Sequence, residues 1–312
     1  MGEPPRERSP SGASRARVDF ARVLDDSRPG IERMLDAFLP ARDEYPPVIH
    51  EAIRYSALGG GKRIRPVLAR EATRALGHDP ELIDKAACAI EYVHASSLVL
   101  DDLPSMDDAA TRRGRPTVHR EFGVATAILS ADALLMHAFR LVADNGADVG
   151  ASGARLATVV AELATAVGSY GMVGGQHVDL ESTHLADAGP EIVEYIQSRK
   201  TAPLFVVAST VGGTLLGASE TDLAALAAYA RSIGLAYQIV DDILDAESDA
   251  ETLGKDVRQD AGKPTFVTLR GIAGAREMAS RLASEASEAV RGLGDGADVL
   301  QAIATYCVER VS

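Results

Sequence analysis

Residues 86–100 read AACAIEYVHASSLVL, and they give the clearest indication of the fold. Apolar side chains cover nearly the whole circumference of this segment, as in a helix that is buried on all sides. At about 100° per residue, His94, Ser97 and Asp101 fall within roughly 60° of one another on its surface. A buried helix with one narrow polar stripe lines a cavity. We therefore expect this helix to run through the middle of a helical bundle.

Helical spacing of apolar residues continues along most of the remaining chain, whereas strand-like alternation is scarce. Pro47, Pro66 and Pro190 stand where helices can begin, because proline is tolerated in the first helical turn. No linker rich in Pro, Gly and Ser divides the chain after residue 20. The sequence predicts an all-α protein, with a disordered tail over residues 1–17 and a single large helical bundle around a central apolar cavity over residues 18–312.

The chain of 312 residues carries a formal charge of −13, which argues against non-specific binding to nucleic acid, since phosphate backbones attract basic surfaces. Its two cysteines, Cys88 and Cys307, are far apart and form no CxxC motif, so we expect no disulfide framework and a reducing compartment. Residues 1–17 contain no apolar run typical of a secretory signal, although their Arg and Ser content leaves a transit peptide as an alternative. We predict a cytoplasmic location.

The longest uncharged segment, residues 201–219, reads TAPLFVVASTVGGTLLGAS and is long enough to cross a bilayer. Its Thr, Ser, Gly and Pro content disfavours insertion and favours a helix buried all round in a large helical core. We therefore expect no stable membrane insertion.

Two aspartates in GLAYQIVDDILD, residues 234–245, indicate a bound cation. Asp241 and Asp245 stack on one helical face about 6 Å apart along the axis, and such carboxylates repel unless a cation neutralises them. Hard oxygen ligands of this kind suit Mg²⁺, which binds one or two carboxylates and completes its shell with water and substrate phosphates. A pair of solvated acidic helix ends is the alternative interpretation.

A second acidic cluster, DDLPSMDD, occupies residues 101–108. Pro104 must break or kink the helix that carries it. Ideal helical angles therefore leave open which of Asp107 and Asp108 lies beside Asp101. The same two interpretations, a Mg²⁺ site and solvated carboxylates, apply here.

Two basic groups call for local anions in a chain of this charge. They are GGGKRIRP at residues 59–66, with Lys62, Arg63 and Arg65, and TRRGRP at residues 111–116, with Arg112, Arg113 and Arg115. Arginine binds phosphate in bidentate fashion and lysine acts as a point charge. GGGK is not a P-loop, because Ser56 and Arg63 stand where that motif needs Gly and then Ser or Thr. A nuclear-localisation or nucleic-acid patch is the alternative, but it explains neither the carboxylates nor the apolar core.

Together, the acidic clusters, the basic groups and the apolar cavity describe a site for magnesium-bound diphosphates with apolar tails. Their order, with GQHVDL at 175–180 and KT at 200–201, resembles the trans-isoprenyl diphosphate synthases, also called polyprenyl synthetases. The resemblance runs from about Tyr55 to Thr265 and is greatest to bacterial geranylgeranyl diphosphate synthases. Tyr237 departs from it, because the family often has Phe before this Gln. The resemblance implies an isoprenoid-synthase fold and a prenyltransferase domain over residues 18–312.

The resemblance also implies roles for individual residues. Isopentenyl diphosphate is held by Lys62, Arg65, His94 and Arg113. The allylic diphosphate is held by Arg112, Lys200 and Lys255. About three Mg²⁺ ions are bound by Asp101, Asp107 and Asp241, with support from Asp102 and Asp245. Thr201 and Gln238 steady the carbocation, so that the catalytic group consists of Lys200, Thr201 and Gln238.

The implied reaction is a head-to-tail condensation of isopentenyl diphosphate with allylic diphosphates. Ser96 and Ser97 are small where short-chain members of the family have an aromatic floor, so we expect a C20 product, geranylgeranyl diphosphate. Replacing Ser96 with Phe should then shorten the product to C15. The family is commonly homodimeric, and the apolar helix over residues 201–219 is compatible with such an interface.

Three alternatives remain open at this stage. The first is a farnesyl or longer-chain polyprenyl diphosphate synthase. The second is a class I terpene cyclase, which binds a single diphosphate and has no need for GGGKRIRP. The third is a non-catalytic subunit that binds a partner synthase.

Overall fold

Helices form most of the computed structural model, which describes residues 18–182, 190–252, 265–294 and 296–309. In chain order they are α1 (Phe20–Ala37), α2 (Pro47–Ala57), α3 (Ile64–Ala75), the 3₁₀ helix η1 (Pro80–Ile83), α4 (Asp84–Asp101), α5 (Val118–Phe122), α6 (Val124–Asp148), α7 (Gly153–Val167), α8 (Met172–Ser182), α9 (Pro190–Lys200), α10 (Ala202–Leu216), α11 (Glu220–Thr252), α12 (Phe266–Ala289) and α13 (Ala297–Glu309). Between α4 and α5, the strands β1 (Thr111–Arg112) and β2 (Arg115–Pro116) pair as a short antiparallel hairpin. The predicted all-α fold is confirmed. The predicted tail, residues 1–17, lies outside the described residues.

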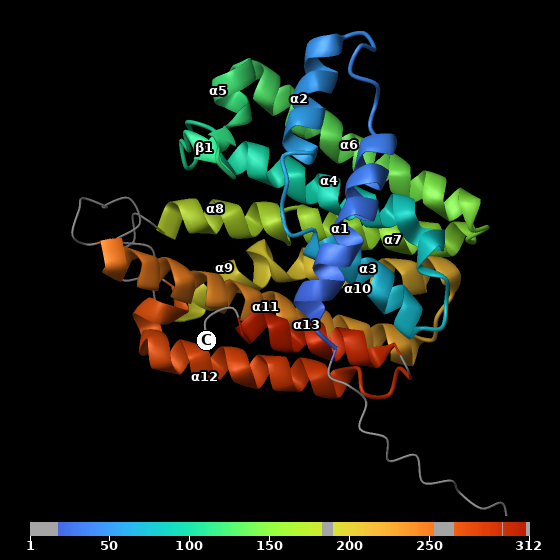
Figure 1. Cartoon of the computed structure of the whole chain (residues 1–312), viewed down its shortest axis with the longest axis vertical. Helices are drawn as coiled ribbons and strands as arrows, with labels where there is room; N and C mark the ends of the chain where they lie inside the picture. Colours follow the sequence, from blue (N-terminus) through green and yellow to red (C-terminus); the bar gives the residue numbers. More distant parts are fainter. Residues whose placement is uncertain (1–17, 183–189, 253–264, 295, 310–312) are drawn as a thin grey trace, which may run out of the picture.

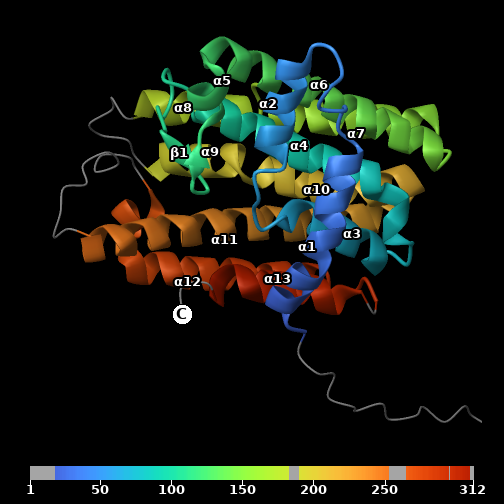
Figure 2. The same ribbon diagram turned by 45° about the horizontal axis from the view of Figure 1, so that its top comes forward.

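The helices stack in layers (Figures 1 and 2). In both views α12 and α13 lie along one side of the bundle and α5 and α6 along the other, with α4 and α10 between them. The most extensive packing joins α11 to α12, α4 to α6, and α10 to α11. Every residue of α4 from Ala86 to Val93 is buried. The helix predicted from residues 86–100 therefore does run through the middle of the bundle.

Helix α10 is buried around most of its circumference, because it packs against α3, α7 and α11. Its glycines permit the close approach of α3, since a Cβ atom on Gly212 would lie only 2.0 Å from Oγ1 of Thr73. The prediction of a buried helix over residues 201–219 is confirmed. Because the apolar side chains of this helix are covered within one chain, its composition alone gives no support to a subunit interface.

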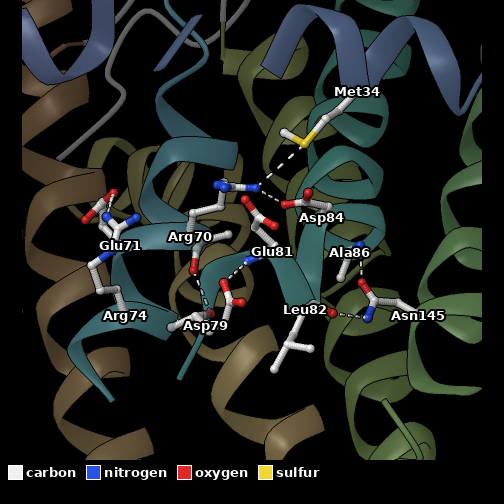
Figure 3. A network of polar contacts seen from close by, with 12 residues as sticks. Met34, Arg70, Glu71, Arg74, Asp79, Glu81, Leu82, Asp84, Ala86 and Asn145 are labelled. Carbon is white, nitrogen blue, oxygen red and sulfur yellow. Dashed lines mark hydrogen bonds and ion pairs between the residues drawn. The ribbon is translucent and has the colours of Figure 1, made fainter. Parts of the chain in front are cut away.

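The start of α4 is held by polar contacts from two other helices (Figure 3). Asn145 of α6 is buried; its Oδ1 accepts a hydrogen bond from the backbone N–H of Ala86, and its Nδ2 donates to the carbonyl of Leu82, both at 2.8 Å. Arg70 of α3 forms an ion pair with Asp84, the first residue of α4. These contacts anchor α4 to α6 and α3, so that Asp101 at its other end has a defined position.

By length and composition alone, three stretches could cross a membrane: Val124–Asp148, Gly153–Ser182 and Glu220–Glu247. In the structure they pack within the bundle, α6 on α4, α7 on α10 and α11 on α12. Helix α6 nevertheless leaves four large apolar side chains exposed, which we call the α6 apolar row: Val124, Ile128, Leu129 and Met136.

Candidate active site

A cavity of about 410 Å³ opens between α3, α4, α8, α10 and α11. One aspartate from each acidic cluster, Asp101 and Asp241, lines it. The basic side chains in its wall are Arg65, Arg112, Arg113 and Lys200, and the apolar ones include Leu98, Met172 and Leu204. The bundle therefore brings together acidic and basic groups that are far apart in sequence, in a hollow that is partly apolar.

The first acidic cluster lies where α4 ends. Burial raises the pKa of Asp101 to about 6, although the charge of Lys200 opposes this shift. The loop after Pro104 folds back, and the backbone N–H of Asp107 donates to the carbonyl of Asp101 at 3.0 Å. Asp108 instead accepts a hydrogen bond from Arg120 at 3.1 Å. The loop thus separates the two candidates and returns Asp107, rather than Asp108, to the end of α4.

Asp102 faces an arginine. Its two carboxylate oxygens accept hydrogen bonds of 2.8, 2.8 and 2.6 Å from Nε and Nη2 of Arg112, and its side chain is buried. This bidentate pair fixes the plane of the guanidinium group. Asp102, predicted as a supporting metal ligand, therefore has Arg112 as its partner in this structure and orients it at the cavity wall.

The second acidic cluster lies on α11. The buried face of this helix consists of Ile239, Val240 and Ile243, which pack into the core with α12. Asp241 lines the cavity on the other face, Asp242 is buried, and Asp245, one turn later, is exposed. Of the predicted pair, only Asp241 lies in the cavity wall.

The three basic side chains of the GGGKRIRP loop point to different places: the solvent, the protein interior and the cavity. Arg63 has a left-handed backbone (φ 54°) and points inward, where its guanidinium pairs with Glu32 of α1 and Glu91 of α4, each at 2.7 Å. Lys62, before it, is exposed, and Arg65, after it, reaches the cavity. The buried Arg63 therefore holds the loop in place while its neighbours remain accessible to an anion.

Arg65 combines apolar and polar surroundings. Its guanidinium carbon lies 4.7 Å from the centroid of the Phe205 ring, and its Nε has no hydrogen-bond partner among the described residues. Burial lowers the pKa of Arg65 from its ordinary value, as expected for a cation in a poorly hydrated wall. A bound diphosphate would supply the missing acceptor and the missing negative charge.

His94 and Arg113 complete this side of the cavity. Burial and the nearby Arg65 hold the pKa of His94 well below its ordinary value, so the ring is neutral at neutral pH. Arg113 lies against Gly61, where a Cβ atom would be 2.9 Å from the guanidinium carbon, and it donates to the carbonyl of Gly60. Gly61 leaves room for this guanidinium, and its φ of 134° is a backbone conformation that residues with a Cβ atom rarely adopt.

The opposite wall is built at the junction of α9 and α10. Lys200 Nζ donates to Oδ2 of Asp179 at 2.8 Å, and Thr201 Oγ1 donates to Oε1 of Gln238 at 2.8 Å. Gln176, one turn before Asp179 on α8, also lines the cavity. Lys200, Thr201 and Gln238, the predicted catalytic group, are therefore neighbours in space.

Comparison with known proteins decides the family. A model of the family described as polyprenyl synthetase matches residues 46–303 of the chain. The chain belongs to the polyprenyl synthetase family. The resemblance recognised in the motifs is confirmed.

Relatives of this polyprenyl synthetase carry consistent names. Geranylgeranyl pyrophosphate synthase 11, chloroplastic, from Arabidopsis thaliana is 42% identical over 307 residues, which cover 95% of this chain and 85% of the relative. The chloroplastic geranylgeranyl pyrophosphate synthase of Catharanthus roseus is 40% identical, with 96% and 83% covered. This chain is therefore similar in sequence to plant geranylgeranyl pyrophosphate synthases over most of its length.

Solved structures agree with the fold of this polyprenyl synthetase. An FPP/GFPP synthase from Zymomonas mobilis has a TM-score of 0.82 and 34% identity, with 94% of this chain and 100% of that chain covered. A geranylgeranyl pyrophosphate synthetase from Pyrococcus horikoshii has a TM-score of 0.82 and 32% identity, with 93% and 98% covered.

The donor set of the polyprenyl synthetase cavity fits Mg²⁺. Among the described residues, no group of three Asp, Glu, His or Cys side chains converges to hold an ion by itself. Asp101 and Asp241 instead offer single carboxylates from different helices. This arrangement suits a hard cation that takes one or two carboxylates and completes its shell with phosphate oxygens and water.

Most predicted site residues line or border this cavity, whereas Lys255 lies outside the described residues. Sequence reasoning missed Gln176 and Asp179, although both belong to the GQHVDL motif that contributed to the resemblance. It also missed Gln197, a buried residue of α9 that donates a hydrogen bond to Asp242 of α11 and has no motif around it. Only the packing of α9 on α11 could have found that residue.

Proposed function

We propose that this polyprenyl synthetase is a Mg²⁺-dependent prenyltransferase that condenses isopentenyl diphosphate with allylic diphosphates to give the C20 product, geranylgeranyl diphosphate. The observation that carries the proposal is the single cavity in which Asp101 and Asp241 face Arg65, Arg113 and Lys200 beside apolar side chains. Such a site holds two diphosphates at its polar end and their hydrocarbon tails in the apolar part.

The reaction begins when the allylic C1–O bond breaks and its electron pair leaves with the diphosphate. Bound Mg²⁺ supplies positive charge that stabilises this leaving group, and Asp101, Asp107 and Asp241 are the residues that would hold it. Arg112 and Lys200 add preorganised positive charge, because Asp102 and Asp179 already orient them. The developing carbocation lies near the oxygens of Thr201 and Gln238.

The second substrate completes the bond. Arg65, His94 and Arg113 hold isopentenyl diphosphate so that its double bond donates an electron pair to C1 of the allylic group. One proton is then lost, and the released diphosphate takes it. Leu98, Met172 and Leu204 exclude water that would otherwise quench the cation.

Two observations support the proposed C20 length of the product. The plant relatives described above are named geranylgeranyl pyrophosphate synthases. Ser97, a small residue one helical turn before Asp101, lines the cavity and leaves its wall open. The Zymomonas mobilis structure, described as an FPP/GFPP synthase, shows that a similar fold serves other chain lengths.

One assay tests the proposal. The purified chain is incubated with Mg²⁺, labelled isopentenyl diphosphate and each of the C5, C10 and C15 allylic diphosphates, and the products are separated by chain length. A C20 product from all three starters is expected. An end point of C15, or one longer than C20, would change the proposed chain length and leave the reaction class as it is. Cyclised hydrocarbon formed without isopentenyl diphosphate would support a terpene cyclase, and no turnover would support a non-catalytic subunit.

A homodimer is the second part of the proposal. The α6 apolar row is exposed by 44% to 58% and follows one helical face, as expected of side chains that a second copy covers. Light scattering should give the mass of two chains, and Leu129→Glu should shift it toward one. Arg281→Glu, an exposed position on α12 at the other side of the bundle, should not. A dimer unaffected by Leu129→Glu would place the interface elsewhere. The cytoplasmic location and the absence of stable membrane insertion stay predictions.

A further inference from the structure

A chain of hydrogen bonds extends behind Thr201 and Gln238, away from the cavity. Nε2 of Gln238 donates to Oδ1 of Asp242 at 3.1 Å, and Nε2 of Gln197 donates to Oδ2 of the same carboxylate at 3.3 Å. Both Gln197 and Asp242 are buried, with 6% and 9% of their surfaces exposed. Neither residue lines the cavity, so neither touches the reacting carbons directly.

The carboxylate determines which end of the Gln238 amide faces the cavity. An ionised carboxylate only accepts hydrogen bonds, so it must face the NH₂ end of that amide. The opposite orientation would place the amide oxygen against the Asp242 carboxylate, where two acceptors repel. The other donors to this carboxylate, Gln197 and the backbone N–H of Phe266, would not relieve that repulsion. Gln238 is therefore held with Oε1 toward Thr201.

Thr201 is ordered by the same chain. Its hydroxyl proton is used in the 2.8 Å hydrogen bond to Gln238 Oε1. The remaining lone pairs of Thr201 Oγ1 are then free to face the cavity that both residues line. The side chains of Thr201 and Gln238 therefore present oxygens to the cavity, and the amide N–H of Gln238 points away from it, which is the polarity that a carbocation needs.

We infer that Asp242 and Gln197 are positioning residues that hold the Gln238 amide oxygen and the Thr201 hydroxyl oxygen toward the allylic carbocation. This inference rests on the proposed prenyltransferase function and adds to it. It assigns Asp242, the middle member of the DDILD aspartates, to orientation of the catalytic group. Asp241 beside it remains the member of the cluster that lines the cavity.

The test uses Asp242→Asn in the full-length enzyme with Mg²⁺. The introduced asparagine must turn its NH₂ group toward Gln238 or Gln197, although both of these side chains donate to this position in the wild type. Part of the enzyme then carries Gln238 with its N–H toward the cavity. We expect kcat to fall by about tenfold to a hundredfold, the range for loss of a hydrogen bond to a charged group, with KM values and the Mg²⁺ requirement unchanged.

A second substitution should restore the rate. When Asp242→Asn is combined with Gln197→Glu, the new carboxylate accepts a hydrogen bond from the NH₂ of the introduced asparagine, which leaves the asparagine oxygen to accept from Gln238. The original polarity returns, and kcat should recover most of its loss. Gln301→Leu is the matched control, because Gln301 donates one amide hydrogen bond in α13, remote from the cavity. It should leave kcat unchanged.

A binding measurement does not depend on turnover. A tertiary-ammonium analogue of the allylic cation, with inorganic diphosphate and Mg²⁺, should bind the wild type more tightly than its neutral carbon isostere does. Asp242→Asn should reduce this ratio by about tenfold. Calorimetry gives both affinities, and the ratio decides the question even where the double variant fails to fold.

Each outcome separates the inference from the proposed function. Wild-type enzyme that does not elongate would overturn the proposed function. An active wild type whose Asp242→Asn variant keeps its kcat and its ammonium preference would overturn the inference alone. So would a variant that recovers full kcat at high Mg²⁺ concentration, because Asp242 would then be a metal ligand.

Discussion

Replacing Ser97 with phenylalanine is expected to shorten the product from C20 to C15. Ser97 lies in the wall of the 410 Å³ cavity, one turn of α4 before Asp101. A phenylalanine there projects into the space that the growing tail must enter. Ser96 differs, because it is buried and its Oγ donates to the carbonyl of Ala131 on α6 at 2.8 Å. Ser97, rather than the predicted Ser96, is therefore the position at which an aromatic side chain would limit the length of the product.

The size of the effect follows from the hydrocarbon that loses its place. One prenyl unit has five carbons, and burial of each is worth about 0.8 kcal/mol, so exclusion of one unit costs roughly 4 kcal/mol. Since about 1.4 kcal/mol corresponds to a factor of ten, the last elongation should slow by up to about a thousandfold. C15 should then replace C20 as the main product, while kcat for the first elongation stays within a few-fold of the wild type.

The assay is chromatography of products formed from the C5 starter, together with thermal unfolding of each variant. Ser97→Ala is the matched control and should keep the C20 product, because it preserves the small side chain. Ser96→Phe should instead destabilise the protein by about 1–3 kcal/mol through overpacking against α6. A Ser97→Phe enzyme that folds normally and still makes C20 would refute the assignment of the cavity wall.

Three further predictions concern the supports of the site. Arg63→Met should lower the free energy of urea unfolding by about 3–5 kcal/mol, because Glu91 stays buried without its cation. The control Arg140→Met removes an exposed ion pair with Asp144 and should lower it by less than about 1 kcal/mol. Asn145→Ala should cost about 1–3 kcal/mol in the same measurement, since it leaves the buried backbone N–H of Ala86 and the partly buried carbonyl of Leu82 without their side-chain partner. A cost near zero would contradict the anchoring of α4. His94→Gln should keep the wild-type pH profile of kcat/KM for isopentenyl diphosphate between about pH 6 and 8, because the lowered pKa leaves the free-enzyme ring neutral there; a lost ionisation step would show that the ring is charged.

Local patterns were enough for the fold class and the acidic and basic groups. The apolar circumference of residues 86–100 predicted α4, and the spacing of residues 234–245 placed Asp241 and Asp245 on one face of α11, away from the buried Ile239, Val240 and Ile243. These predictions succeed because helical periodicity depends only on neighbours three and four residues apart.

Other features depended on contacts between distant segments. Spacing left Asp107 and Asp108 equivalent until the loop after Pro104 was seen to fold back on Asp101. It also could not separate Arg63, buried between Glu32 and Glu91, from the accessible Lys62 and Arg65. The direction of the Arg63 side chain is set by carboxylates on α1 and α4, which lie far away in the chain.

Periodicity along the chain was thus sufficient to specify helices and their buried faces, and the order of the motifs was sufficient to suggest the family. The pairing of Asp102 with Arg112, the exposure of the α6 apolar row and the link from Gln197 to Asp242 came from the folded bundle alone. A hydrogen bond or a covered surface exists only when two distant elements meet, and no local pattern of residues specifies which side chain will find which partner.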